Sequence, residues 1–294
     1  MIPVSDERGP RRRFPFVNLA LVAFNTGLFI YQAALGESVA AFVLTYGLVP
    51  QELTTGRDLP PLSPLPLWMT IFTSMFLHGG WLHLGGNMLY LWVFGDNVED
   101  RLGHLKYLLF YLACGMVAAL AQIAVGPASP VPMVGASGAI AGVLGAYLVL
   151  YPGAQVRTLL IAGVLTRLVP VPAFVLIGFW ALLQLFNGLA SLEVETQQTG
   201  GVAYWAHVGG FSAGVLLMLL AAKLGPPRTE LLPGTPTHEL AARLPPASRR
   251  QLPTMPSMGA ALAPPAAALE APGEGNSVRR MRRRRLRQAD PDAP

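Results

Sequence analysis

Charged residues are scarce in this 294-residue chain: Asp, Glu, Lys and Arg make up 13% of it, against 52% for hydrophobic residues. Soluble domains usually carry about a quarter charged residues, so the chain has too little polar surface for a water-soluble fold. A helix needs roughly 20 apolar residues to cross the hydrocarbon core of a bilayer, and several runs here reach that length. The composition therefore predicts a membrane protein.

Cysteine and metal-ligand motifs are also nearly absent. Cys114 is the one cysteine of the chain, so no intrachain disulfide can form. There is no His-Glu-x-x-His sequence, and Asp96 and Asp100 fall at the end of an apolar run rather than inside one. The chain therefore lacks the ligand set of a zinc metalloprotease and the two acids of an aspartyl protease, and we expect neither a metal nor a cofactor.

Positive charge is concentrated near the C-terminus. Seven arginines lie between Arg279 and Arg287, and removing them takes the formal net charge from +5 to −2. The basic character belongs to the Pro- and Arg-rich residues 225–294, which we expect to be a disordered tail, and nucleic acid is not an expected partner. Such a tail either binds anionic membrane lipid or stays solvated. Residues 1–15 are also polar and basic, and we expect disorder there too.

Six long apolar runs predict an all-α, polytopic membrane helix bundle over residues 16–224. The predicted spans are residues 16–35, 81–98, 105–125, 135–152, 172–189 and 202–220. The loop 36–76 is apolar, but its Pro-rich stretch 59–67 excludes a regular helix, so we expect the loop to lie in the membrane interface. Residues 158–169 are apolar but too short to span, and we expect an interfacial position for them as well.

Lysine and arginine are distributed asymmetrically among the predicted loops. One side of the predicted bundle holds most of the basic residues: Arg101, Arg157, Arg167 and both basic termini. The loops on the other side hold Arg57 as their one basic residue. Because cytoplasmic loops are enriched in basic residues, we expect both termini in the cytoplasm, and we expect a bacterial plasma membrane as the location. Spans two, four and six then all run from the outer side inward.

Four polar residues lie near the outer ends of these three spans: His83 and Asn87 in the second, Ser137 in the fourth and His207 in the sixth. Polar side chains at membrane depth are costly and usually face the interior of a helix bundle, where they mark a functional site or a helix–helix contact. Their common depth favours one shared site.

Ser137 lies in the sequence Gly135-Ala136-Ser137-Gly138, where a proline-containing loop gives way to the fourth span. Free N–H groups and the dipole at a helix N-terminus favour negative charge, so a serine nucleophile there could pass a developing oxyanion to the backbone. The alternative is structural, because small residues such as Gly138 and Gly142 commonly serve close helix packing.

His207 is followed by Gly210 and Gly214 on the same helical face. These glycines would let the imidazole approach a partner helix closely, where it would form a nucleophile–base pair with the serine. His83 and Asn87, spaced four apart, also share a face, and each could donate a hydrogen bond to a tetrahedral oxyanion. The alternative for all of these residues is a polar contact between helices.

Taken together, these motifs resemble those of the rhomboid family of intramembrane serine proteases. The resemblance extends over residues 67–223, with every motif in the expected order and on the expected span, and implies a six-helix rhomboid fold. It rests on His83-x-x-x-Asn87, Val98-Glu99-Asp100-Arg101-Leu102-Gly103, Gly135-Ala136-Ser137-Gly138 and Ala206-His207-x-x-Gly210-x-x-x-Gly214.

The resemblance also implies a function. Ser137 would be the nucleophile and His207 its base, without the third acid of a triad, while His83 and Asn87 would stabilise the oxyanion. The substrates, and hence the expected partners, would be transmembrane segments of other membrane proteins. They would reach the serine sideways from lipid, beside the fifth span, and be cut near the outer face of the bilayer.

Two positions depart from the pattern of the family. Trp68 in the first long loop is followed by Met69, where arginine is common, and Ala141 stands where well-known members have a tyrosine that stacks on the histidine. Support for His207 must therefore come from elsewhere. Two rival functions stay open: a catalytically inactive rhomboid-like protein that binds membrane clients, and a channel or transporter, for which the sequence offers no internal repeat.

Overall fold

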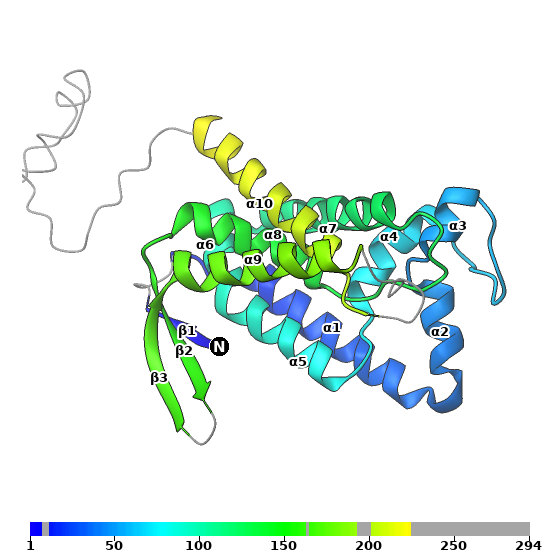
Figure 1. Cartoon of the computed structure of the whole chain (residues 1–294), viewed down its shortest axis with the longest axis horizontal. Coiled ribbons are helices and arrows are strands. Elements are labelled where there is room, and N and C mark those ends of the chain that lie inside the picture. The colour runs from blue at the N-terminus through cyan, green and yellow to red at the C-terminus, as the bar shows by residue number, and fades with distance from the viewer. Residues whose placement is uncertain (8–11, 163–164, 193–200, 225–294) are drawn as a thin grey trace, which may run out of the picture. The chain divides into compact units, whose positions relative to one another are not determined.

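The computed structural model describes residues 1–7, 12–162, 165–192 and 201–224, most of which are helical (Figure 1). Each long helix begins and ends within four residues of the corresponding predicted span, when α5 (Trp81–Tyr90) and α6 (Asp96–Leu102) are counted as one helix. The predicted tail, residues 225–294, lies outside the described residues. The long helical segments are α1 (Phe16–Ala34), α5 (Trp81–Tyr90), α6 (Asp96–Leu102), α7 (His104–Val125), α8 (Ser137–Leu150), α9 (Ala173–Ala190) and α10 (Tyr204–Leu224).

Four helices in the described part of the chain are long and apolar enough to cross a membrane: α1, α7, α9, and α10 over Tyr204–Ala221. Large hydrophobic side chains are exposed on all four, for example Phe24 on α1, Leu120 on α7, Phe186 on α9 and Leu216 on α10. Extensive exposed apolar surface marks a membrane or partner contact rather than a water-facing surface, so these helices are suited to lipid.

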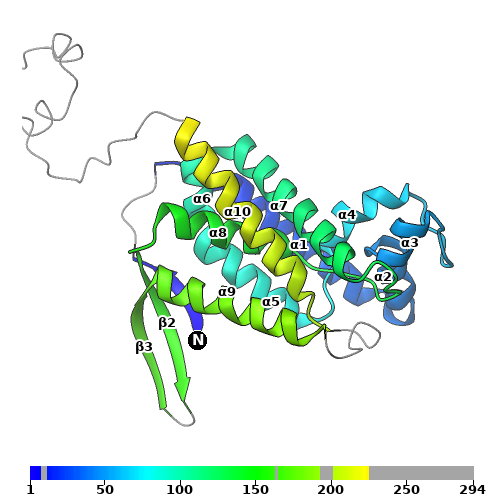
Figure 2. The same cartoon turned by 45° about the horizontal axis from the view of Figure 1, so that its top comes forward.

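Two further helical segments are apolar but fall short of that length as single α-helices. α5 continues through a π-helical turn, Leu91–Gly95, directly into α6. α8 has 14 residues, ten of them buried, because it is surrounded by the other helices (Figures 1 and 2). The predicted number of six spans therefore depends on these two segments.

Glycines allow α10 to pack closely on α8. A Cβ atom on Gly210 would overlap the carbonyl oxygen of Gly138, and a Cβ on Gly214 would overlap that of Gly142. Small residues at such positions let two helix backbones approach, which is how helices commonly associate in membranes. In both views α10 crosses α8 (Figures 1 and 2), and this crossing determines which side chains meet where α8 begins.

Glu99 on α6 caps the start of α1. The N-cap residue of α1, Pro15, provides no side-chain hydrogen bond. Instead, the carboxylate of the fully buried Glu99 accepts hydrogen bonds from the backbone N–H groups of Val17 at 2.9 Å and Asn18 at 2.7 Å. A carboxylate at this position satisfies free N–H groups and interacts favourably with the helix dipole, so it fixes α1 against α6.

A three-stranded antiparallel sheet corrects the expectation of an all-α fold. β1 (Ile2–Asp6) pairs with β2 (Gln155–Ala162), which pairs with β3 (Leu165–Pro172). The expectation of disorder was wrong for Ile2–Asp6, because the backbone groups of this strand form hydrogen bonds with β2. β2 is distant in the sequence, so no local sequence pattern reveals this pairing. Residues 158–162 and 165–169, part of the apolar run expected at the interface, belong to β2 and β3, since a short apolar run does not distinguish a strand from another buried segment.

Residues 36–76 and the loop of residues 126–136 lie at the end of the helical bundle away from the sheet (Figures 1 and 2). Leu48 and Met133 exchange backbone hydrogen bonds, joining the loop before α5 to the loop before α8. Residues 59–66 contain no helix, in keeping with their prolines. The short helices of this region are η1 (Gly36–Ser38), α2 (Val39–Tyr46), α3 (Pro50–Thr55), η2 (Leu67–Met69), α4 (Thr70–Thr73) and η3 (Ser74–Phe76).

Candidate active site

Ser137 is the first residue of α8 and follows a turn that requires glycine. Gly135 has a φ of +125°, a conformation that residues with a Cβ rarely adopt. A Cβ there would also come within 2.7 Å of the His83 Nε2 atom, and the Gly135 N–H donates to the Ser74 carbonyl at 2.9 Å. The turn thus presents the serine at a helix N-terminus, beside the start of α5.

His207 on α10 lies next to this serine. The His207 Nε2 atom is 2.8 Å from the Ser137 Oγ atom, although 70 residues separate them in sequence. His207 is buried, while Ser137 is partly exposed. A neutral imidazole whose Nε2 carries no hydrogen can accept the serine proton, so this pair has the geometry of a nucleophile and its general base.

His83 and Asn87 lie beside the Gly135 turn, where a Cβ on Gly135 would be 2.7 Å from His83 Nε2 and 3.6 Å from Asn87 Nδ2. The Gly79 N–H donates to His83 Nδ1 at 3.3 Å, so the neutral ring of His83 carries its proton on Nε2, the nitrogen that faces Gly135. Within the described residues the Asn87 Nδ2 amide is buried and has no hydrogen-bond partner. Both side chains therefore have a donor free to stabilise negative charge beside the serine.

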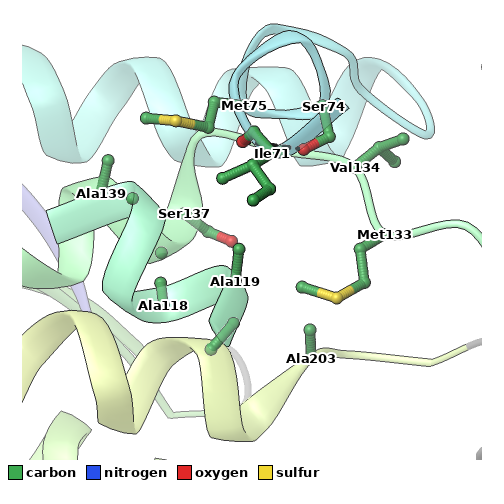
Figure 3. Close-up of a pocket in the computed structure, with 14 residues that line it drawn as sticks. Ile71, Ser74, Met75, Ala118, Ala119, Met133, Val134, Ser137, Ala139 and Ala203 are labelled. Carbon is green, nitrogen blue, oxygen red and sulfur yellow. Dashed lines mark hydrogen bonds between the residues drawn. The ribbon is translucent and has the colours of Figure 1, made fainter. Parts of the chain in front are cut away.

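A cavity opens in front of Ser137 (Figure 3). Its wall combines the segment before α5, including Ile71 and Ser74, with the loop before α8, including Met133. Small residues from α7 and from the chain around the start of α10, such as Ala203 just before that helix, complete the lining. The close-up shows the serine side chain among these groups (Figure 3), so the hydroxyl faces a cavity with a mostly apolar lining.

Sequence reasoning missed two residues of α9 that contact the histidine. The Gln184 Oε1 atom lies 2.8 Å from His207 Nδ1, and the Trp180 ring lies 5.8 Å from the imidazole, centroid to centroid, at 38°. The available signal was an amide side chain within the apolar run Ala173–Ala190, four residues after a tryptophan. No cluster of three or more His, Cys, Asp or Glu that could hold a metal occurs among the described residues.

The family model of the Rhomboid domain matches residues 66–224, more than half of the chain. This chain belongs to the rhomboid family. Together with its apolar helices, this membership makes the rhomboid described here an integral membrane protein.

Several curated proteins are similar to this rhomboid. It is 32% identical over 161 residues to Rhomboid protease GluP of Bacillus subtilis, covering 55% of this chain and 27% of that protein. It is 30% identical over 158 residues to Rhomboid-like protein 11, chloroplastic, of Arabidopsis thaliana, covering 54% of each. It is 32% identical over 157 residues to Rhomboid protein 1, mitochondrial, of Saccharomyces cerevisiae, covering 50% of this chain and 40% of that protein.

This rhomboid therefore spans about half or less of the length of those relatives. Chloroplastic and mitochondrial proteins stand beside a bacterial one among them. The relatives consequently give no support to the expectation of a bacterial plasma membrane over another membrane.

Proposed function

We propose that this rhomboid is a serine endopeptidase that cleaves transmembrane segments of other proteins within the membrane. The 2.8 Å contact between Ser137 Oγ and His207 Nε2 carries the proposal, because a serine needs an adjacent base to become a nucleophile. Further support comes from a similar protein named as a rhomboid protease. The proposed partners are transmembrane proteins as substrates and membrane lipid as their route to the serine.

In the first half-reaction, His207 Nε2 takes the proton of the Ser137 hydroxyl while Oγ attacks the carbonyl carbon of a substrate peptide bond. The carbonyl oxygen becomes an oxyanion that accepts hydrogen bonds from Asn87 Nδ2, His83 Nε2 and the Ser137 backbone N–H. His207 then gives its proton to the leaving amine nitrogen, the C–N bond breaks, and the acyl group remains on the serine.

In the second half-reaction, water attacks the acyl carbon and gives a proton to His207. The C–O bond to Ser137 breaks, His207 returns the proton to the serine oxygen, and a carboxylic acid leaves. No carboxylate is assigned to the histidine in this scheme, so the imidazolium lacks the ionic stabilisation that the acid of a triad provides. We therefore expect a slow enzyme.

The proposed membrane domain has six spans over residues 16–224, with both termini on the cytoplasmic side. Helix continuity supports the second span, because α5, the π-helical turn and α6 run without a break from Trp81 to Leu102. Pairing of β1 with β2 supports the orientation, since it puts the basic N-terminal segment on the same side as Arg157. The backbone N–H groups of Arg12 and Arg13 also donate to the carboxylate of Asp100, near the end of α6.

The test is a fluorophosphonate probe together with a cleavable transmembrane reporter, applied to the purified full chain in detergent. Ser137→Ala should lose both labelling and cleavage, and His207→Ala should lose cleavage, because removing either member of such a unit costs nearly the whole effect. Melting temperatures of both variants verify that they are folded. Reporter cleavage by Ser137→Ala at the wild-type rate would disprove the proposed function, and wild type that neither reacts nor cleaves would favour a client-binding protein.

A further inference from the structure

The second ring nitrogen of His207 has a partner of its own. The Gln184 Oε1 atom lies 2.8 Å from His207 Nδ1, on the side of the imidazole away from Ser137. Gln184 is partly buried in α9, a helix that is otherwise almost entirely apolar. An amide at membrane depth is costly unless it is hydrogen-bonded, so its contact with the histidine accounts for its presence there.

The tautomer of the imidazole determines whether His207 can act as a base. A neutral histidine carries one proton, and the hydrogen bond at one nitrogen sets which nitrogen bears it. A carbonyl oxygen at Nδ1 can only accept, so it favours the proton on Nδ1 and leaves Nε2 bare. Nε2 is the atom that faces Ser137 Oγ, and only when bare can it take the serine proton.

We propose that Gln184 is a positioning residue for the reaction, which holds His207 in the Nδ1–H tautomer and fixes the plane of its ring. This inference rests on the proposed function and deepens it, because it assigns the support for His207 that Ala141 cannot provide. The amide replaces the carboxylate of a triad in orientation but not in charge. Its contribution should therefore be smaller than that of a triad acid.

Contacts on three successive turns of α9 support this role. Trp180, Gln184 and Gly188 are spaced four apart and therefore lie on one face of the helix. The Trp180 ring packs beside the imidazole, and the Trp205 Nε1–H donates to the Gly188 carbonyl at 3.1 Å. α9 thus contacts the histidine helix immediately before, at and after Gln184, which restricts movement of the amide relative to the ring.

Gln184→Leu and Gln184→Glu test the role in the full chain. Leucine removes the acceptor, and we expect kcat and the rate of fluorophosphonate labelling to fall about tenfold, as for loss of one hydrogen bond, with KM little changed. Glutamate keeps an acceptor and should restore most of the rate. Gln122→Leu is the matched control, because Gln122 Oε1 accepts from the backbone N–H of Ala206, beside the histidine, at 3.2 Å. It should lose stability but keep its turnover per folded molecule.

Nitrogen NMR with labelled histidine gives a second reading, taken on the wild-type chain rather than on a Gln184 variant. Assigned by its loss in His207→Gln, the signal should report the Nδ1–H tautomer. Three results would each overturn the positioning role. They are a full rate in Gln184→Leu, a rate in folded Gln184→Glu as low as that of Gln184→Leu, and an Nε2–H tautomer of His207 in the wild-type chain. If Ser137→Ala is inactive in the same assays, such a result counts against Gln184 alone and leaves the proposed function standing.

Discussion

Gly210 on α10 lies so close to Gly138 on α8 that a side chain at Gly210 would occupy the space of the Gly138 carbonyl oxygen. Gly138 immediately follows Ser137, and Gly210 lies one turn after His207. Their contact therefore sets the distance between the two proposed catalytic side chains, and the separation of the helices is part of the chemistry of the site.

Gly210→Ala should both destabilise the protein and slow cleavage. Overpacking of a tight interior costs about 1–3 kcal/mol, and the helices must separate to admit the methyl group, which lengthens the Ser137–His207 contact. Melting temperature and reporter cleavage on the same preparation measure the two effects. Gly178→Ala on α9 is the control, because nothing lies within 4 Å of a Cβ there. An equally active Gly210→Ala would show that the site tolerates helix separation.

Asn87→Ala should reduce kcat by about 10²–10³, the usual cost of losing one oxyanion donor. His83→Ala should cost the same or less, since the amide and the backbone N–H remain. Both variants should still react with the probe, more slowly, because the nucleophile is unchanged. Asn25→Ala is a matched control: its buried amide on α1 donates within its own helix, to Leu21. If Asn87→Ala were destabilised but fully active, Asn87 would serve helix packing instead.

Stability should depend on pH through His78, which lies in the loop before α5. Burial, reinforced by the neighbouring His83, lowers the pKa of His78 from 6.5 to about 4. Between these values the unfolded chain binds a proton that the folded chain does not, so acidification from pH 6.5 toward 4 should destabilise the fold by about 1.4 kcal/mol per pH unit. His78→Leu should reduce the difference in melting temperature between pH 7 and pH 5. An unchanged difference would contradict this assignment.

The orientation can be tested with single cysteines in a Cys114→Ala background. Ser63→Cys, in the loop before the second span, should react with a membrane-impermeant thiol reagent in intact cells, because the positive-inside distribution puts that loop outside. Ser277→Cys should react only after the membrane is permeabilised. Labelling of Ser277→Cys in intact cells would reverse the proposed topology.

The long helices of this rhomboid could be predicted because apolar runs of span length are a local property of sequence. The sheet could not, since β1 and β2 lie far apart in the chain and each strand is too short to carry a decisive pattern. The capping of α1 by Glu99 was equally invisible, because a side chain from another helix supplies what Pro15 lacks. Both features depend on contacts that exist only after the bundle has assembled.

The candidate site divides in the same way. Polar residues are conspicuous in apolar helices, and four of them also matched the motifs of one family: Ser137, His207, His83 and Asn87. Their catalytic roles stay predictions. Gln184 is also a polar residue in an apolar helix, but it belongs to no motif of the family. Its position in the sequence did not predict a contact with His207. Its partner became evident only from the way α9 lies on α10.

The pairing of β1 with β2 has a consequence for the order of biosynthesis. Ile2–Asp6 is made before Gln155–Ala162, which follows α1, α5–α6, α7 and α8. At translation rates of about 5–20 residues per second, the first strand waits on the order of 10 s or longer for its partner. Closure of the sheet is therefore a late assembly event, which ties Ile2–Asp6 to the segment after α8 once α1, α5–α6, α7 and α8 have been synthesised.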